Sequence, residues 1–124
     1  MKVLLDSDVL IEVMRGRKQE LVARWVQLAD SGASLLCSPV TVAELWHGAR
    51  PGETEQLEDL FAALTCVPIS EETGRRAGDY LRQYAPSHGV ELGDALIAAC
   101  ASIHDAALWT RNRKHFPMKN LTFF

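Results

Sequence analysis

The segment VLLDSDVLIE, residues 3–12, decides the expected fold because an apolar run leads directly into two acids. Val3–Leu5 indicates a short buried strand, and Asp6 follows it immediately. Asp8 comes two residues later, where an acid can cap or begin a helix. In α/β proteins, ligands bind beyond the carboxyl ends of the strands, which is the position of Asp6. The segment is equally typical of a strand that ends in a helix cap, so the rest of the chain must separate the two interpretations.

The size and composition of the chain predict a single globular domain over residues 1–124. The chain has 124 residues, of which 48% are hydrophobic and 23% are charged, and this suffices for a substantial core. The N-terminal residues do not resemble a signal peptide, and the longest uncharged stretch, 31–43, is too short and too polar to span a bilayer. We therefore expect a cytoplasmic protein without a membrane partner.

The cysteines are spaced without a CxxC pair. An odd number of widely separated cysteines, each beside apolar neighbours, is typical of free thiols in a reducing compartment. We expect all of them to be buried structural residues: Cys37, Cys66 and Cys100.

Apolar runs and helical patterns alternate along the chain. We expect short strands at residues 2–6, 34–38, 66–70, 106–110 and 121–124. We expect helices at residues 8–14, 21–29, 39–49, 53–65, 71–84 and 92–104, with a loop at 85–89. Pro68 lies inside the third strand and predicts a sheet edge, since proline cannot donate to a β-ladder. This alternation indicates an α/β fold with a mainly parallel sheet covered on both faces.

Three acids lie in surroundings that solvated surface acids rarely have. Asp6 follows the first apolar run, Glu44 lies in PVTVAELWHGA, and Asp94 lies in ELGDALIAA. Each is near a strand-to-helix junction or in the first turns of a helix, so one rim of the sheet can hold all three. Clustered carboxylates are costly unless a cation compensates them, and three acids suffice for Mg²⁺ with its waters. The histidines lack the spacing of zinc ligands.

Each of these acids also has an ordinary structural interpretation. Asp6 can cap a helix, Asp94 can favour a helix N-terminus electrostatically, and Glu44 can be an exposed helical residue. Only their joint placement favours a metal site.

A basic segment near the C-terminus contrasts with the net charge of −3. The stretch TRNRKHFPMKN, residues 110–120, holds Arg111, Arg113, Lys114 and Lys119 and no acid. Such a segment can contact phosphates even on an acidic protein, and it is also typical of a solvated terminal loop.

Four segments, in this order, resemble the PIN-domain family, and specifically the VapC-type ribonuclease toxins of bacterial toxin–antitoxin pairs: LLDSDVLIE, SPVTVAELWHGA, ELGDALIAA and LWTRNRKHF. Together they span nearly the whole chain. The resemblance implies a three-layer α/β/α sandwich with a five-stranded, mainly parallel sheet whose third strand lies at an edge.

The resemblance also implies roles for particular residues. It places the catalytic, metal-binding acids at Asp6, Glu44 and Asp94. His115 takes the position where many members have a fourth acid, which leaves three carboxylates for the metal. Glu91 is close to Asp94 in sequence, but this spacing does not fix its direction. The supporting polar residues are Asp8, Thr110 and Asn112.

The implied activity is that of a metal-dependent endoribonuclease toxin. It would hydrolyse phosphodiester bonds in structured cellular RNA with Mg²⁺, or Mn²⁺, and so inhibit translation. The implied partners are the RNA substrate, a second copy in a homodimer, and a cognate antitoxin in a hetero-oligomer. Trp25 and Trp46 are candidates for the antitoxin's groove and equally for the core. Candidate RNA-binding residues are Arg111, Arg113 and Lys114, followed by Arg15, Arg17 and Lys18.

Two other functions fit parts of the sequence. LLDSDVL also resembles the opening of haloacid-dehalogenase-type phosphatases, in which Asp6 would be the nucleophile. That family needs a further acid where this chain has Ala98, and a lysine that is absent between Lys18 and Lys114. The other alternative is a non-catalytic PIN-like module that binds RNA or a protein, and strict metal dependence of cleavage would exclude it.

Overall fold

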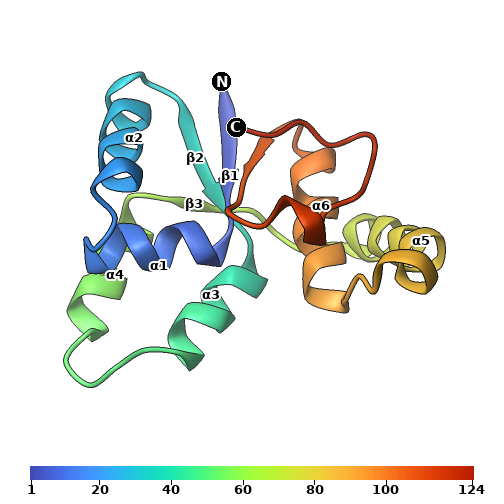
Figure 1. Ribbon diagram of the computed structural model, residues 1–124, viewed down its shortest axis with the longest axis horizontal. Helices are drawn as coiled ribbons and strands as arrows, with labels where there is room; N and C mark the ends of the chain where they lie inside the picture. Colours follow the sequence, from blue (N-terminus) through green and yellow to red (C-terminus); the bar gives the residue numbers. More distant parts are fainter.

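The computed structural model describes residues 1–124 as one sheet with helices packed around it (Figure 1). The strands are β1 (Lys2–Leu5), β2 (Ser34–Cys37), β3 (Thr65–Cys66) and β4 (Ala107–Trp109). The helices are α1 (Ser7–Arg15), α2 (Gln19–Asp30), α3 (Pro39–His47), α4 (Thr54–Ala62), α5 (Glu71–His88), α6 (Leu92–Ile103) and the short 3₁₀ helix η1 (Arg113–His115). None of the helices combines the length and the hydropathy that a membrane span requires.

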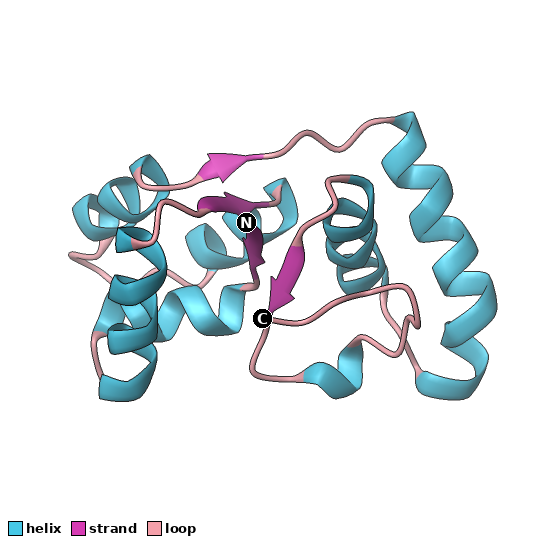
Figure 2. Ribbon diagram, turned by 90° about the horizontal axis from the view of Figure 1, so that it is seen from above, coloured by secondary structure: helices cyan, strands magenta, loops and turns pink.

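The sheet separates two apolar cores, because successive side chains of a strand point to opposite faces. Leu4 of β1 and Leu108 of β4 belong to the core that α5 and α6 cover. Leu5 and Trp109, from the same two strands, belong to the opposite core with residues of α1, α2, α3 and α4. Figure 2 shows the two groups of helices on either side of the strands. The predicted α/β architecture, with helices on both faces of the sheet, is therefore confirmed.

All strand pairs are parallel, in the order β3-β2-β1-β4. β1 is central, and its register pairs Leu4 with Leu36 on one side and with Leu108 on the other. Parallel pairing brings the carboxyl ends of β1, β2 and β4 to the same edge of the sheet. The residues that follow these strands therefore meet there. β3 lies at the edge, as the sequence predicts.

The expected fifth strand at 121–124 is wrong as a full strand. This segment makes only an isolated parallel bridge, between Leu108 and Phe123. The chain turns at Met118, whose carbonyl accepts from the Leu121 amide, so only a short stretch remains to pair with β4. The sheet therefore has four strands, although Phe123 still packs against one core and Phe124 against the other.

Three other local expectations are corrected. The loop expected at 85–89 is largely helical, because α5 continues through Pro86 to His88 and ends at Gly89 in the left-handed conformation, with φ of 64°. A proline so near the end costs few helical hydrogen bonds. The third strand ends before Pro68. Cys66 on this edge strand is exposed, whereas Cys37 and Cys100 are buried as expected.

Short polar residues start α1 and α3, which follow β1 and β2. The Asp6 side chain caps α1 by accepting from the Ser7 amide. Ser38 caps α3 by accepting from the Thr41 amide, and Pro39 takes the first helical position. The chain therefore turns directly from β1 and β2 into helices, without long loops.

Leu4→Ala should lower the free energy of unfolding by about 2–5 kcal/mol, because Leu4 is fully buried in the central strand and its truncation leaves a cavity. Urea denaturation of the purified chain measures this loss. Val26→Ala is the matched control: Val26 is 48% exposed, and its loss should stay within about 0.5 kcal/mol. Equal losses for the two variants would contradict the assigned core.

Candidate active site

An acidic pocket lies at the carboxyl end of β1, beside the first turns of α1 and α6. Its volume is about 280 Å³. Five of its eight lining residues are acids, and none is Lys or Arg. The lining residues are Asp6, Ser7, Asp8, Glu44, Glu91, Asp94, Asn112 and His115. The structure thus brings the three predicted acids into one pocket.

Asp6 is the most enclosed acid of this pocket. Its Oδ1 accepts from the Ser7 amide at 2.9 Å, and its Oδ2 accepts from the Thr110 hydroxyl at 2.9 Å. Burial is the main cause that raises the pKa of Asp6 to about 6, and the charge of Asp8 comes next. The two hydrogen bonds act in the opposite direction. Asp6 therefore carries a negative charge that its surroundings compensate only in part.

Asp8 holds the segment after β4 against α1. Its two carboxylate oxygens accept from the Arg111 amide at 3.2 and 3.1 Å. Thr110, one residue earlier, accepts from the Asn112 amide at 3.1 Å while it donates to Asp6. Asp8, Thr110 and Asn112, the predicted supporting polar residues, therefore lie around Asp6.

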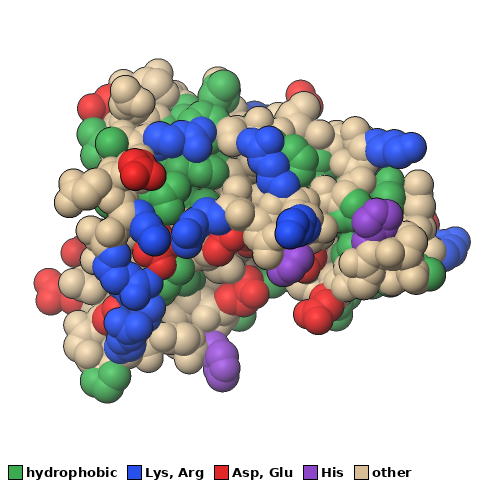
Figure 3. Space-filling model, viewed as in Figure 1, with side chains coloured by type: hydrophobic (Ala, Val, Ile, Leu, Met, Phe, Trp, Pro, Cys, Tyr) green, Lys and Arg blue, Asp and Glu red, His purple; other side chains and the backbone are tan.

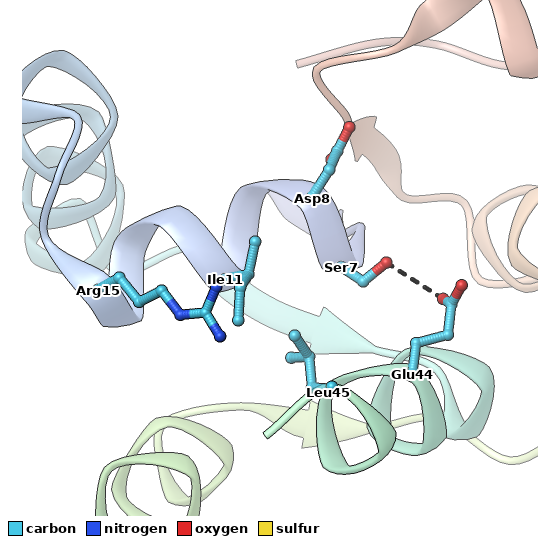
Figure 4. Close-up of a pocket in the computed structure, with 7 residues that line it drawn as sticks. Ser7, Asp8, Ile11, Arg15, Glu44 and Leu45 are labelled. Atoms are coloured by element: carbon cyan, nitrogen blue, oxygen red, sulfur yellow. Dashed lines mark hydrogen bonds between the residues drawn. The ribbon is translucent and has the colours of Figure 1, made fainter. Parts of the chain in front are cut away.

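Glu44 reaches the acidic pocket from α3. The Ser7 hydroxyl donates to its Oε1 at 3.1 Å, and Figure 4 shows this hydrogen bond between the first residue of α1 and the side chain from α3. Sequence reasoning did not single out Ser7, because a serine that begins a helix is ordinarily a capping residue.

Asp94 lies in the first turn of α6 and faces His115 of η1. The His115 Nδ1 is 3.6 Å from the Asp94 Oδ2, and its Nε2 is 3.1 Å from the Asn112 side-chain nitrogen. Burial raises the pKa of Asp94, and proximity to His115 is the largest effect that lowers it. The Glu91 side chain caps no amide of α6 and lines the same pocket. The structure therefore gives the direction of this side chain, which the sequence position left open.

The acidic pocket continues into a groove along α1. A second hollow of about 290 Å³ shares Ser7, Asp8 and Glu44 with it (Figure 4). Ile11 and Leu45 contribute apolar surface to this groove. The remaining lining residues are Arg15 and Gly48.

The candidate phosphate contacts differ in how free their charged groups are. Arg15 is held by Glu53, which accepts from its Nε at 3.1 Å and from its Nη2 at 3.2 Å. Only 14% of the Arg15 side chain is exposed, so this guanidinium serves mainly to join α1 to the turn before α4. Arg113 lies over the Phe123 ring, 4.8 Å from its centroid.

Arg17 and Arg111 have a different arrangement, because both face the Glu12 carboxylate. Lys114 is exposed on η1. Figure 3 shows Lys and Arg side chains spread over the face of the molecule that contains α1, with acids between them. Glu12 and Glu53 could not be recognised from the sequence as partners of these arginines, since they have the pattern of ordinary charged residues on and before helices.

The donor chemistry of the acidic pocket fits a hard divalent cation. Its carboxylates have no Lys or Arg among them, and the raised pKa values of Asp6 and Asp94 reflect burial and like charges. Mg²⁺ binds through one or two carboxylates and keeps several waters. No three His, Cys, Asp or Glu side chains are arranged to hold a metal ion by themselves. The assignment of individual ligands therefore stays a prediction.

Comparison with known proteins gives the family. The PIN domain matches residues 3–120. The chain belongs to the PIN-domain family, and within it to the VapC-type ribonuclease toxins. It is similar to Ribonuclease VapC10 of Mycobacterium tuberculosis, with 43% identity over 118 residues, covering 94% of this chain and 86% of the relative.

Solved structures show the same fold. VapBC2 from Rickettsia felis, bound to a DNA fragment from its promoter, gives a TM-score of 0.84 at 23% identity, covering 100% of this chain and 98% of that one. VapBC-1 from nontypeable Haemophilus influenzae gives a TM-score of 0.80 at 25% identity, covering 100% and 97%.

Asp6→Asn should raise the free energy of unfolding at pH 8 when EDTA removes divalent cations. The pKa of Asp6 in the folded chain is about 6, above its ordinary 3.8, so the folded chain binds this proton more tightly. The resulting stabilisation is complete below about pH 4 and is lost as the pH rises through 6. The stability lost over this pH range is at most about 3 kcal/mol. The variant should keep the helix cap, because asparagine caps helices as well as aspartate does.

Urea denaturation at pH 4 and pH 8 measures this effect, with the variant gaining stability relative to the original chain only at the higher pH. Glu58→Gln, at an exposed acid in the interior of α4, should show no such difference. A gain in the free energy of unfolding that is the same at both pH values would show that folding does not raise the pKa of Asp6.

Proposed function

We propose that this ribonuclease toxin is a metal-dependent endoribonuclease that cuts structured cellular RNA in the cytoplasm with Mg²⁺ or Mn²⁺, and so inhibits translation. The observation that carries the proposal is a pocket with five acids and no Lys or Arg, next to a surface that bears Lys and Arg side chains. A phosphodiester can enter so negative a pocket only together with a compensating cation. The arginines beside it suit the neighbouring phosphates.

Asp6, Asp94 and Glu44 would hold the cation, directly or through water. A divalent cation bound there would polarise the scissile phosphate and lower the pKa of a coordinated water. Thr110 supports this site by donating to the Asp6 Oδ2, which favours the ionised carboxylate. His115 also favours the ionised form of Asp94, because its proximity lowers the Asp94 pKa.

Glu44 is suited to orient the attacking water. Ser7 donates to its Oε1, which fixes the carboxylate while the Oε2 can accept a hydrogen bond from water. In-line attack on the phosphorus would leave a 5′-phosphate and a 3′-hydroxyl. This route does not need the ribose 2′-hydroxyl as nucleophile, so preference for RNA would come from shape and from contacts to unstacked bases.

We further propose a cognate antitoxin as the partner of this chain. The two similar solved structures are VapBC2 and VapBC-1. An apolar groove of about 350 Å³ between α1, α2 and α4 suits a segment of such a partner, and Trp25 lines it together with Met14 and Leu60. Trp46, the other tryptophan considered, does not line this groove and is 40% exposed on α3. Trp46 and Leu92 offer exposed apolar surface to the proposed homodimer.

The phosphatase alternative finds no support at the site. It requires a lysine near Asp6, and no lysine lines the acidic pocket. The non-catalytic module differs from the nuclease only in activity, so the cleavage assay below decides between them.

Asp6→Asn should abolish RNA cleavage while the fold is kept, because the variant loses the ligand charge and keeps the side-chain shape. The assay is cleavage of total cellular RNA by the purified protein, freed of copurified antitoxin, in Mg²⁺ or in EDTA. We expect discrete fragments with Mg²⁺, none with EDTA, and none from the variant in either condition. Asp30→Asn is the control and should cleave normally. Fragments from folded Asp6→Asn, or undiminished cleavage in EDTA, would refute the proposed chemistry.

His115→Ala should reduce cleavage by no more than about tenfold, since one exposed charge partner typically contributes about 1 kcal/mol or less. The same change should raise the pKa of Asp94, because His115 lowers it. Initial rates at several pH values measure both effects, as a lower rate and an acidic limb that moves to higher pH. Complete loss of activity would instead make His115 an essential ligand or catalyst.

A further inference from the structure

Glu12 is a buried carboxylate that the proposed chemistry does not use. It lies on α1 one helical turn after Asp8, and only 8% of its side chain is exposed. Its Oε1 accepts from the Arg17 Nη2 at 2.6 Å, whereas its Oε2 is buried without a hydrogen-bond partner. An unpaired buried carboxylate oxygen is costly, so this position asks for an explanation beyond packing.

Two guanidiniums converge on this carboxylate from distant parts of the chain. Arg17 follows α1, and Arg111 follows β4 and places its Nη1 3.9 Å from the same Oε1. The Arg17 and Arg111 side chains are 53% and 40% exposed, so most of their N–H groups remain free for an outside partner. Arg15 contrasts with them, because Glu53 takes two of its donors and the side chain is largely buried.

This arginine pair is coupled to the acidic pocket through α1. Asp8, which lines the pocket, accepts from the Arg111 amide, and Glu12 attracts the guanidinium of the same residue. Positions 8 and 12 lie on one face of a helix. α1 therefore holds Arg111 at both its backbone and its charged end, and Arg17 joins it at Glu12.

We propose that Arg17 and Arg111, held together by Glu12, bind a phosphodiester of the RNA backbone beside the one that is cut. The inference rests on the proposed function and adds to it a second phosphate site. Glu12 acts as a positioning residue: it does not touch RNA, and it fixes the two guanidiniums before RNA arrives. Fixed guanidiniums lose less side-chain freedom on binding and present their donors in a planar fork that suits phosphate oxygens.

The first test measures binding of a fluorescein-labelled RNA stem–loop by anisotropy, in EDTA, over a range of salt concentrations. Arg17→Gln and Arg111→Gln should each weaken binding about three- to tenfold and reduce the salt dependence by about one phosphate contact. Arg82→Gln is the matched control, because it removes the same charge from an exposed pair on α5, and it should stay within about twofold. Arginine variants that bind like this control would overturn the proposal.

The second test separates positioning from simple charge. Arg111→Lys keeps the charge and loses the fork, so it should bind RNA nearly as poorly as Arg111→Gln. In a Glu12→Gln background the difference between arginine and lysine at 111 should disappear, because the guanidinium is no longer fixed. Full RNA binding by Arg111→Lys, or additive effects of the changes at positions 12 and 111, would show that Glu12 does not position Arg111.

These outcomes are distinguishable from failure of the proposed function, because binding is measured without a divalent cation. If the original chain binds RNA but does not cut it with Mg²⁺, the nuclease proposal fails and the phosphate site stands. If it cuts RNA while the arginine variants match Arg82→Gln, the phosphate site fails and the nuclease stands. If the chain binds no RNA in EDTA, the phosphate site fails, and cleavage in Mg²⁺ decides the nuclease proposal separately.

Discussion

The close approach of several carboxylates at the end of β1 is the constraint on which the site depends. Buried like charges repel one another, and folding must offset this cost elsewhere. The chain does so only in part: Thr110 and Ser7 donate to Asp6, and His115 faces Asp94. The parallel sheet makes the arrangement possible, because the carboxyl ends of its strands lie at one edge. Helix N-termini that start there add partial positive charge.

α1 links the acidic pocket to the basic surface. Asp6 caps the helix and Asp8 holds the segment after β4, so both belong to the negative end. Further along α1, Glu12 pairs with the exposed side chains of Arg17 and Arg111. Arg15 joins α1 to Glu53. A single short helix thus separates a region suited to a cation from a region suited to phosphates. This separation lets an acidic chain of net charge −3 approach a polyanion locally.

The sequence predicted the parts of the structure that follow from local pattern. The apolar run before Asp6, the Ser38-Pro39 start of α3 and the small-residue helix with Asp94 are all present. The structure also brings the three predicted acids into one pocket. Residues 121–124 do not form a full strand, because the number of residues that can pair with β4 depends on a tertiary turn. α5 continues past Pro86, because a proline near a helix end is tolerated.

Partners across the chain were beyond the reach of local pattern. Ser7 donates to Glu44, which lies 37 residues further along the sequence. Glu12 on α1 faces Arg111, which follows β4. Glu91 joined the acidic pocket although its spacing fixed no direction. Cys66 looked buried by its apolar neighbours, but it lies on an edge strand that leaves it exposed. Such contacts depend on how elements pack, and no short sequence window contains that information.

The most direct test of the central claim is an NMR titration of the Asp6 side-chain carboxyl carbon, with and without Mg²⁺. The account predicts a midpoint near pH 6 in EDTA, because burial and neighbouring charge raise the pKa of Asp6 to about 6. Saturating Mg²⁺ should move this midpoint well below that value, since a bound cation favours the ionised carboxylate. An Asp6 midpoint that Mg²⁺ leaves unchanged would contradict the account, because the cation would then not be compensating this charge.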